Sequence, residues 1–125
     1  MIDASLAAPS RLVNLRGPVY LGDFAKNATI KRVWGTNDRD GGAANRTTAG
    51  SIVVYRDANT SETTAGVTDT ATFDSTDGLN LVAIATTDSF YRKGSTYTAV
   101  LKGAVIDGQT VNWPLAIFGV ERVRQ

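Results

Sequence analysis

Short runs of β-branched and aromatic residues alternate with turn signals along most of this chain. Val, Ile, Thr, Tyr, Phe and Trp together account for 44 of the 125 residues, whereas only two Glu and four Lys are present. β-Branched and aromatic side chains suit a pleated sheet, and the residues that usually cover the exposed faces of helices are scarce. The pattern predicts an all-β protein.

The turn signals divide the chain into seven or eight candidate strands. The strongest signal is Asp107-Gly108, which lies between Ala104–Ile106 and Gln109–Val111 and is typical of a two-residue type I′ hairpin. We expect one helical turn at Asp88–Lys93. The other expected strands are Val19–Leu21, Ala28–Thr36, Ser51–Arg56, Val67–Phe73, Leu79–Ala85, Tyr97–Leu101 and Trp113–Arg122.

This number of short strands in one domain of ordinary size predicts an antiparallel β-sandwich over residues 19–125, with closure into a small barrel as the alternative. Several strands are apolar on both faces. In Ser51–Arg56, for example, Ile52 and Val54 oppose Val53 and Tyr55. A sandwich with one solvated face alternates more cleanly, so we expect the excess apolar surface to be covered by the N-terminal segment or by another chain.

The absence of cysteine and histidine excludes several kinds of chemistry together. Disulfides, thiol nucleophiles, imidazole bases, zinc sites and Ser-His-Asp triads all need one of these residues. A net charge of +1 supplies no excess positive field for nucleic acid, and no apolar run approaches the length that spans a bilayer. We therefore expect no cofactor, no nucleic-acid partner and no membrane partner.

The acidic residues offer a weak case for a glycosidase, which needs two placed carboxylates. The candidates are Asp69, Asp74 and Asp77, or Asp38 with Asp40. Asp is favoured in turns for local hydrogen bonding, and most of these residues lie at turn signals. We therefore predict structural acids and no enzymatic activity.

The segment 37–42 also has the acid spacing that begins a calcium loop. A twelve-residue loop of that kind closes with a bidentate Glu. The closing position here would be Thr47 or Ala49, and Arg39 lies between the acids. We therefore predict a solvated loop and no metal site.

Four aromatic residues are candidates for a platform on which sugar rings stack, namely Trp34, Tyr55, Tyr91 and Trp113. Aromatic residues also favour strands and cores. Sugar binding at a host surface is thus an alternative function, which requires at least two of these rings on one exposed face.

An ordered series of motifs covers about residues 17–123. It comprises a Gly-Asp element before the first long strand, Val54-Tyr55, Phe73-Asp74 followed by Gly78–Val82, the Phe90-Tyr91…Gly94…Tyr97 stretch, the Ile106–Gly108 hairpin and the closing Phe118–Glu121 strand. This series resembles small immunoglobulin-like modules of tailed bacteriophages. Such modules occur as free-standing virion proteins and as N-terminal domains of baseplate or tail-fibre proteins.

The resemblance implies an immunoglobulin-like sandwich and a non-enzymatic structural role in a virion. Its work would be subunit contact, at the tail or fibre-attachment region or as a capsid decoration (cement) protein. The partners would be capsid, adaptor or tail-fibre subunits, and the chain would be present in several copies.

Two groups of apolar residues are candidates for such contacts. We expect residues 1–18 to form an extended N-terminal arm that docks on a neighbouring subunit or lies across the sandwich, with a disordered terminus as the alternative. In the closing strand, the resemblance places Phe118 and Val120 toward the core, so a period of two turns every second residue from Trp113 outward along a sheet edge that contains Pro114. The candidate interface residues are Ile2, Leu6, Leu12, Val13 and Leu15 in the arm and Trp113, Leu115 and Ile117 in the strand.

One alternative for the closing strand is a register slip by one residue at Pro114. In that case Trp113 turns back into the core.

Overall fold

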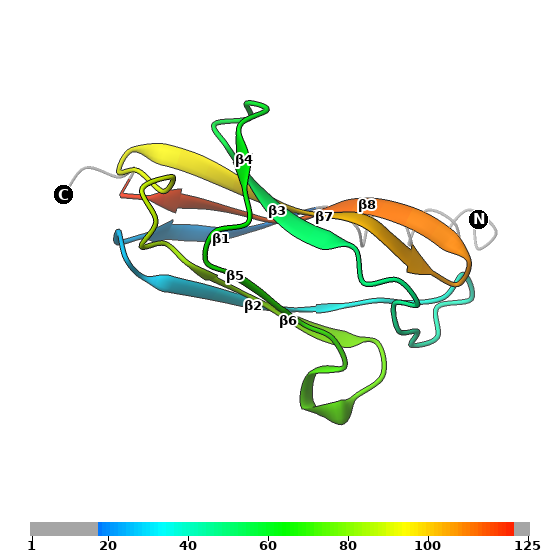
Figure 1. The fold of residues 1–125 in the computed structure, drawn as a ribbon. Coiled ribbons are helices and arrows are strands. Elements are labelled where there is room, and N and C mark those ends of the chain that lie inside the picture. The colour runs from blue at the N-terminus through cyan, green and yellow to red at the C-terminus, as the bar shows by residue number, and fades with distance from the viewer. Residues whose placement is uncertain (1–17, 122–125) are drawn as a thin grey trace, which may run out of the picture.

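The structure is a computed structural model that describes residues 18–121, and these form two β-sheets that pack face to face (Figure 1). The five-stranded sheet contains, in spatial order, β1 (Val19–Phe24), β8 (Gln109–Val120), β7 (Ser95–Ile106), β3 (Ser51–Arg56) and β4 (Glu62–Thr63). The three-stranded sheet contains β2 (Thr29–Gly35), β6 (Leu79–Ala85) and β5 (Val67–Thr70), and a short 3₁₀ helix, η1 (Phe73–Ser75), precedes β6.

The strand order is that of an immunoglobulin-like sandwich. β2, β5 and β6 occupy the places of strands B, D and E in one sheet, and β3, β7 and β8 those of C, F and G in the other. All pairings are antiparallel except the one between β1 and β8, which is parallel. The predicted all-β sandwich is therefore confirmed. The barrel alternative is wrong, because the two sheets remain separate.

Most predicted strands are present, with the largest differences at bulges. β3 and β6 have the predicted bounds, and Asp107 and Gly108 have φ values of 50° and 72°, as a type I′ turn requires. β7 and β8 each join two predicted strands into one, because an extra residue is tolerated within the ladder. Sequence reasoning missed the two-residue strand β4.

Two local expectations need correction. The Asp88–Lys93 segment contains a turn in which the Tyr91 N–H donates to the Asp88 carbonyl oxygen at 3.0 Å, but it forms no helix. The predicted strand Val67–Phe73 ends at Thr70, because Thr72 adopts a left-handed backbone conformation that leads into η1.

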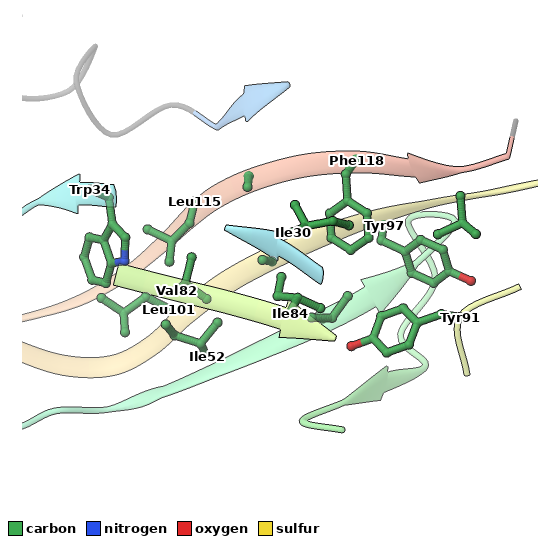
Figure 2. Close-up of a cluster of buried hydrophobic side chains, with 14 of the residues drawn as sticks. Ile30, Trp34, Ile52, Val82, Ile84, Tyr91, Tyr97, Leu101, Leu115 and Phe118 are labelled. Carbon is green, nitrogen blue, oxygen red and sulfur yellow. The ribbon is translucent and has the colours of Figure 1, made fainter. Parts of the chain in front are cut away.

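The core lies between the sheets and draws on both (Figure 2). From the three-stranded sheet come Ile30, Trp34, Val82 and Ile84, all at most 4% exposed. The five-stranded sheet contributes residues that include Ile52, Val54, Tyr97, Ala99, Leu101, Leu115, Ala116, Phe118 and Val120.

An aromatic group closes one end of this core. The Tyr97 ring stacks on Phe118 with centroids 5.4 Å apart, and its hydroxyl donates to the Phe90 carbonyl oxygen at 3.0 Å. This contact corresponds to the tyrosine corner of immunoglobulin-like sandwiches, in which a Tyr of strand F bonds the backbone upstream. Tyr91 is also fully buried and donates its hydroxyl to the Ala65 carbonyl oxygen at 2.8 Å. Both phenols are therefore satisfied by backbone acceptors.

A bulge in β8 overturns the predicted facing of the closing strand. Ala116 lies opposite Ala99, but Pro114 lies opposite Val100, so Leu115 is an extra residue on β8. Leu115 is only 3% exposed and belongs to the core instead of pointing outward. Pro114, expected to point inward, shares its side of the sheet with Val100.

The same bulge reverses the prediction for Trp113. Trp113 lies opposite Leu101, a core residue, and packs against the core while remaining partly exposed. Arg32 on the opposite sheet donates from Nη1 to the Leu115 carbonyl oxygen at 2.6 Å, which provides a partner for a carbonyl displaced by the bulge. Only Ile117 keeps its predicted outward direction. The register slip at Pro114 is the arrangement that the structure shows.

Two glycines offer a matched test of the backbone. Gly66 and Gly94 both have positive φ, but a Cβ at Gly66 would lie 2.1 Å from the Ala85 carbonyl oxygen, whereas a Cβ at Gly94 would meet nothing within 4 Å. We expect Gly94→Ala to destabilise the fold by about 1–2 kcal/mol through left-handed strain alone. Gly66→Ala must also displace the Ala85 backbone and should cost clearly more. Urea unfolding of both variants measures this, and equal losses would contradict it.

Stability at alkaline pH should depend on Tyr91. Burial raises the pKa of the Tyr91 phenol well above its usual value of about 10, and Asp88 and Tyr97 raise it further. The unfolded chain releases this proton near pH 10 while the folded chain keeps it, so the free energy of unfolding falls as pH rises above about 10. Tyr91→Phe should flatten this decline, at a loss of about 1 kcal/mol near neutrality for the hydrogen bond to Ala65. Unfolding midpoints measured from pH 8 to 11 test this, and an unchanged alkaline slope would refute it.

Candidate interaction surface

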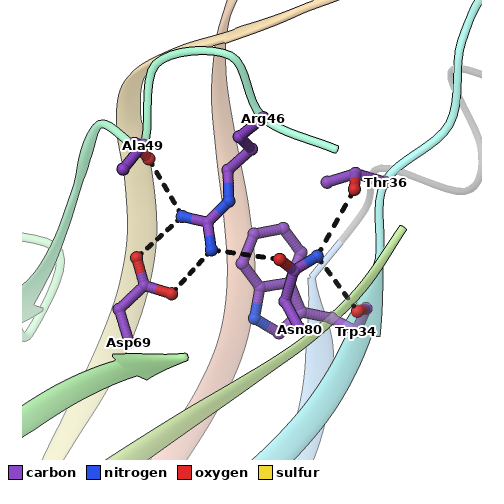
Figure 3. Close-up of polar contacts among 6 residues, drawn as sticks. All are labelled: Trp34, Thr36, Arg46, Ala49, Asp69 and Asn80. Atoms are coloured by element: carbon purple, nitrogen blue, oxygen red, sulfur yellow. Dashed lines mark hydrogen bonds and ion pairs between the residues drawn. The ribbon is translucent and has the colours of Figure 1, made fainter. Parts of the chain in front are cut away.

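The loop that joins β2 to β3 is anchored by one buried arginine (Figure 3). The Arg46 side chain is 1% exposed and binds the Asp69 carboxylate through two contacts, Nη1 to Oδ2 at 2.7 Å and Nη2 to Oδ1 at 2.8 Å. It also donates to Asn80 Oδ1 at 3.0 Å and to the Ala49 carbonyl oxygen at 2.9 Å. A planar guanidinium suits such a forked arrangement.

Further contacts connect this polar cluster to the core. The Arg46 guanidinium lies over the Trp34 ring, 5.0 Å from its centroid, and the Asn80 amide donates to the Trp34 carbonyl oxygen and to Thr36 Oγ1, both at 3.4 Å. Within residues 18–121, only Arg46 Nε and Trp34 Nε1 are buried side-chain polar atoms without a hydrogen-bond partner. The cluster thus uses most of its polar atoms internally and holds the loop against the sheets.

Sequence reasoning missed Arg46, although one signal was present. Asn80 shares a strand face with Val82 and Ile84, both 1% exposed. A polar residue in phase with core residues must find a buried partner. That requirement pointed to a polar contact, but not to a partner 34 residues earlier in the chain.

Two of the remaining candidate acids, Asp77 and Asp38, have hydrogen-bond partners within the fold. Asp77 Oδ1 accepts from Asn45 Nδ2 at 2.9 Å, and Asp38 Oδ1 accepts from the backbone N–H groups of Asp40 and Gly42, both at 2.9 Å. These contacts are those of turn residues. Across the described part of the chain, no three acidic side chains come close enough together to hold a metal ion.

The four aromatic candidates do not form a sugar platform. Trp34 is 4% exposed and Tyr91 is fully buried, so both belong to the core. Trp113 packs against the core from the inner side, whereas Tyr55 lies on the outer side of the five-stranded sheet. These four rings are therefore divided between the interior and one sheet face, and no two of them share an exposed face.

The outer face of the five-stranded sheet is unusually apolar. One row of residues across β8, β7 and β3 points into the core and is fully buried, namely Ala116, Ala99 and Val54. Because successive residues of a strand face opposite sides, the rows on either side of it point away from the core. One flanking row holds the exposed Tyr20 and the partly exposed Ile117, Thr98 and Tyr55, and the other holds the partly exposed Pro114 and Val100 and the buried Val53. Six of these seven residues, all except Thr98, are apolar or aromatic. We call these six residues, Tyr20, Ile117, Pro114, Val100, Tyr55 and Val53, the apolar outer face.

The β1 end of the apolar outer face is its most exposed part. Tyr20 lies opposite Ile117 and is 56% exposed, whereas the neighbouring Val19, 40% exposed, lies beside Ala116 and points to the other side of the sheet. Among residues 18–121 the third large apolar residue with such exposure is Val33, at 46%, on the other sheet. Exposed apolar residues that gather on one face are typical of interaction sites.

A polar rim bounds the other end. Lys102 Nζ donates to the Tyr55 hydroxyl at 2.8 Å and lies 3.5 Å from Glu62 Oε1. The hydrogen bond with Tyr55 and the nearby Glu62 carboxylate raise the pKa of Lys102. Lys102 and Glu62 also line a shallow open depression beside Val53. An apolar centre with a charged rim is the usual anatomy of a protein interface.

The structure places only one of the predicted interface residues on this surface. Ile117 belongs to the apolar outer face, whereas Leu115 and Trp113 pack inward. The arm candidates Ile2, Leu6, Leu12, Val13 and Leu15 lie outside the described residues.

Comparison with known proteins adds no relative: no protein-family model, curated protein or solved structure matches the chain. In the described residues, no helix has the length and apolar character needed to cross a membrane.

The buried pair predicts a large stability loss when one partner is removed. Arg46→Met should destabilise the fold by about 3 kcal/mol, because Asp69 loses its counter-charge and the loop loses its anchor. Arg39→Met serves as the control, since Arg39 forms an exposed pair with Asp107 at 3.2 Å and should lose at most about 1 kcal/mol. Urea unfolding compares the two, and similar losses would contradict the anchoring role.

Proposed function

We propose that this chain is a non-enzymatic structural protein of a bacteriophage virion that makes subunit contacts through the apolar outer face. The place of the contact would be the tail or fibre-attachment region or the capsid surface, where the protein would act as a decoration subunit. The proposal rests on the ordered motif series described above and on one structural observation. That observation is the apolar outer face, with Tyr20 and Ile117 at its exposed end.

The chemistry of this surface favours binding to protein. Apart from Thr98 its centre is aliphatic and aromatic, and its charged groups, Lys102 and Glu62, lie at the rim and pair with each other. Interfaces between proteins concentrate binding energy in such apolar centres and leave charge at the edge. A sheet face is also rigid, so a partner can bind it with little loss of conformational entropy.

The sugar-binding alternative lacks a comparable feature. Stacking on a sugar uses the flat face of accessible rings, and of the four rings considered above two are buried. Of the acids considered for hydrolysis, Asp38 and Asp77 hold loops and turns and Asp69 pairs with Arg46. No structural observation specifically favours sugar binding or hydrolysis.

The proposal can be tested in particles of the phage whose genome encodes the chain. We expect cryo-electron microscopy and mass spectrometry to find the protein in purified virions in many copies. Density for the module should contact its neighbour through the apolar outer face. Absence from purified particles, or contact only through the three-stranded sheet, would contradict the proposal.

A matched pair of substitutions tests the surface itself. The double variant Tyr20→Thr with Ile117→Thr places β-branched Thr, which suits a strand, at both positions and removes the exposed apolar side chains. Val33→Thr makes the same kind of change on the other sheet and serves as the control. We expect all variants to lose about 1 kcal/mol of stability or less, and only the double variant to lose incorporation into virions. Equal incorporation of the double variant and Val33→Thr would refute the role of this face.

A further inference from the structure

β2 is an outer strand of the three-stranded sheet, and one of its edges has no partner strand. In the order β2-β6-β5, β2 pairs with β6 alone, over its full length from Thr29 to Gly35. No other strand within residues 18–121 pairs with it. An edge of this kind presents a row of backbone donors and acceptors, which is a template for another strand.

The hydrogen bonds to β6 show which backbone groups of β2 point to the open edge. Residues of an antiparallel ladder alternate between pairs that exchange hydrogen bonds and pairs that do not. One step beyond the end of the ladder, the Thr36 N–H donates to the Gly78 carbonyl oxygen at 2.8 Å, so even-numbered residues of β2 bond to β6. The N–H and C=O groups of Lys31, Val33 and Gly35 therefore point to the open edge. Within residues 18–121 these groups have no strand opposite them.

An apolar row on the outer side of the three-stranded sheet ends at this edge. Ile30 and Trp34 face the core and are 2% and 4% exposed, so the alternate residues of β2 face outward. Val33 is 46% exposed and lies beside the partly exposed Leu81, which in turn lies beside Thr70 of β5. On its open side, Val33 gains a cross-strand neighbour only when another strand is added at this edge.

The two positive charges of β2 limit which strand can be added. Lys31 and Arg32 are adjacent, and β2 contains no acidic residue. In an antiparallel pair of two copies with a twofold axis at Val33, Lys31 lies opposite Gly35 and Arg32 lies opposite Trp34 of the second copy. An axis at Lys31 or at Arg32 would instead place like charges directly opposite each other, which is destabilising. The charges thus select one register for pairing between two copies.

The register with the axis at Val33 also satisfies the groups at the open edge. Val33 exchanges both backbone hydrogen bonds with its own copy, and Lys31 does so with Gly35 of the second copy. Gly35 leaves room for the aliphatic stem of Lys31, since a Cβ built at Gly35 meets only the Gly78 carbonyl oxygen, at 3.6 Å. The apolar row then continues from Val33 through its copy to Leu81 of the second copy.

We propose that β2 pairs antiparallel with β2 of a second copy of this chain around a twofold axis at Val33, which joins two three-stranded sheets into one. The occupant is a second copy because the edge is self-complementary in register and charge. A contact made through strand edges buries less area than a standard interface, so we expect a weak dimer that forms between about 10 μM and about 1 mM. The inference is independent of the proposed function, since it uses the other sheet.

The absence of cysteine makes a cross-linking test direct, since an introduced cysteine is the only thiol. Val33→Cys places two thiols opposite each other at the axis, where Cα atoms of a hydrogen-bonded pair lie about 5.5 Å apart, within the reach of a disulfide. Lys31→Cys is the matched control, because its thiol faces the same side but lies about 13 Å along the strands from its copy. We expect mild oxidation to cross-link Val33→Cys about tenfold faster than Lys31→Cys, or more.

Charge exchange at position 33 tests the symmetry without a covalent bond. Val33→Lys and Val33→Glu each place like charges opposite each other, and each variant should remain monomeric in sedimentation velocity experiments. An equal mixture of the two variants should dimerise, because opposite charges then face each other. Tyr20→Lys is the control, since it adds the same charge at a similarly exposed residue of the other sheet and should leave the dimer unchanged.

Each other outcome overturns the proposal. A chain that remains monomeric up to about 1 mM does not use this edge for a second copy. Cross-linking of Lys31→Cys as fast as that of Val33→Cys means that the register is different. Loss of the dimer in Tyr20→Lys places the contact on the apolar outer face. Slow hydrogen exchange at the amides of Lys31, Val33 and Gly35 in a monomer means that another part of the same chain covers the edge.

Discussion

The pairing of β7 with β8, and the extra residue within it, determines which side chains of the large sheet reach the core. The two strands form the longest ladder of the molecule and meet at the Asp107-Gly108 turn. Leu115 shifts the register by one residue, so that both Leu115 and Ala116 are buried and Trp113 lies against the interior. Arg32 reaches across from the opposite sheet to the displaced carbonyl, which links the two sheets at this point.

A second constraint acts at the loop between β2 and β3. Loops generally lie on the surface and gain little from packing. Here Arg46 brings the loop to the interior, where Asp69 and Asn80 satisfy its charge and most of its donors. A buried ion pair is a weak source of net stability because both groups lose their hydration, but its geometry admits few alternatives. The loop thereby reaches β7 as well, where the Val105 N–H donates to the Thr48 carbonyl oxygen at 3.0 Å.

Local patterns predict the parts of this fold whose causes are local. The Asp107-Gly108 hairpin and the bounds of β3 and β6 follow from turn chemistry and β-propensity within a few residues. A period of two cannot decide the direction of Trp113 and Leu115, since a bulge interrupts that period, and Pro114 indicated the slip only as an alternative. The same limit applies to the Arg46 cluster, whose partners Asp69 and Asn80 lie far along the chain. The apolar outer face could be predicted from the sequence only in part. The two-sided apolar pattern of Ser51–Arg56 indicated it, but the contribution of Tyr20 needed the parallel pairing of β1 with β8.

That parallel pairing also has a consequence for the order of folding. β1 precedes every other described strand in the chain and β8 follows them all, yet Val19 pairs with Ala116. Contacts of such long sequence separation form late, because closing the intervening loop costs entropy before any contact repays it. β1 must therefore remain without its partner strand until β8 has been synthesised. The other described strands pair with neighbours closer in sequence, so we expect the pairing of β1 with β8 to form last among them.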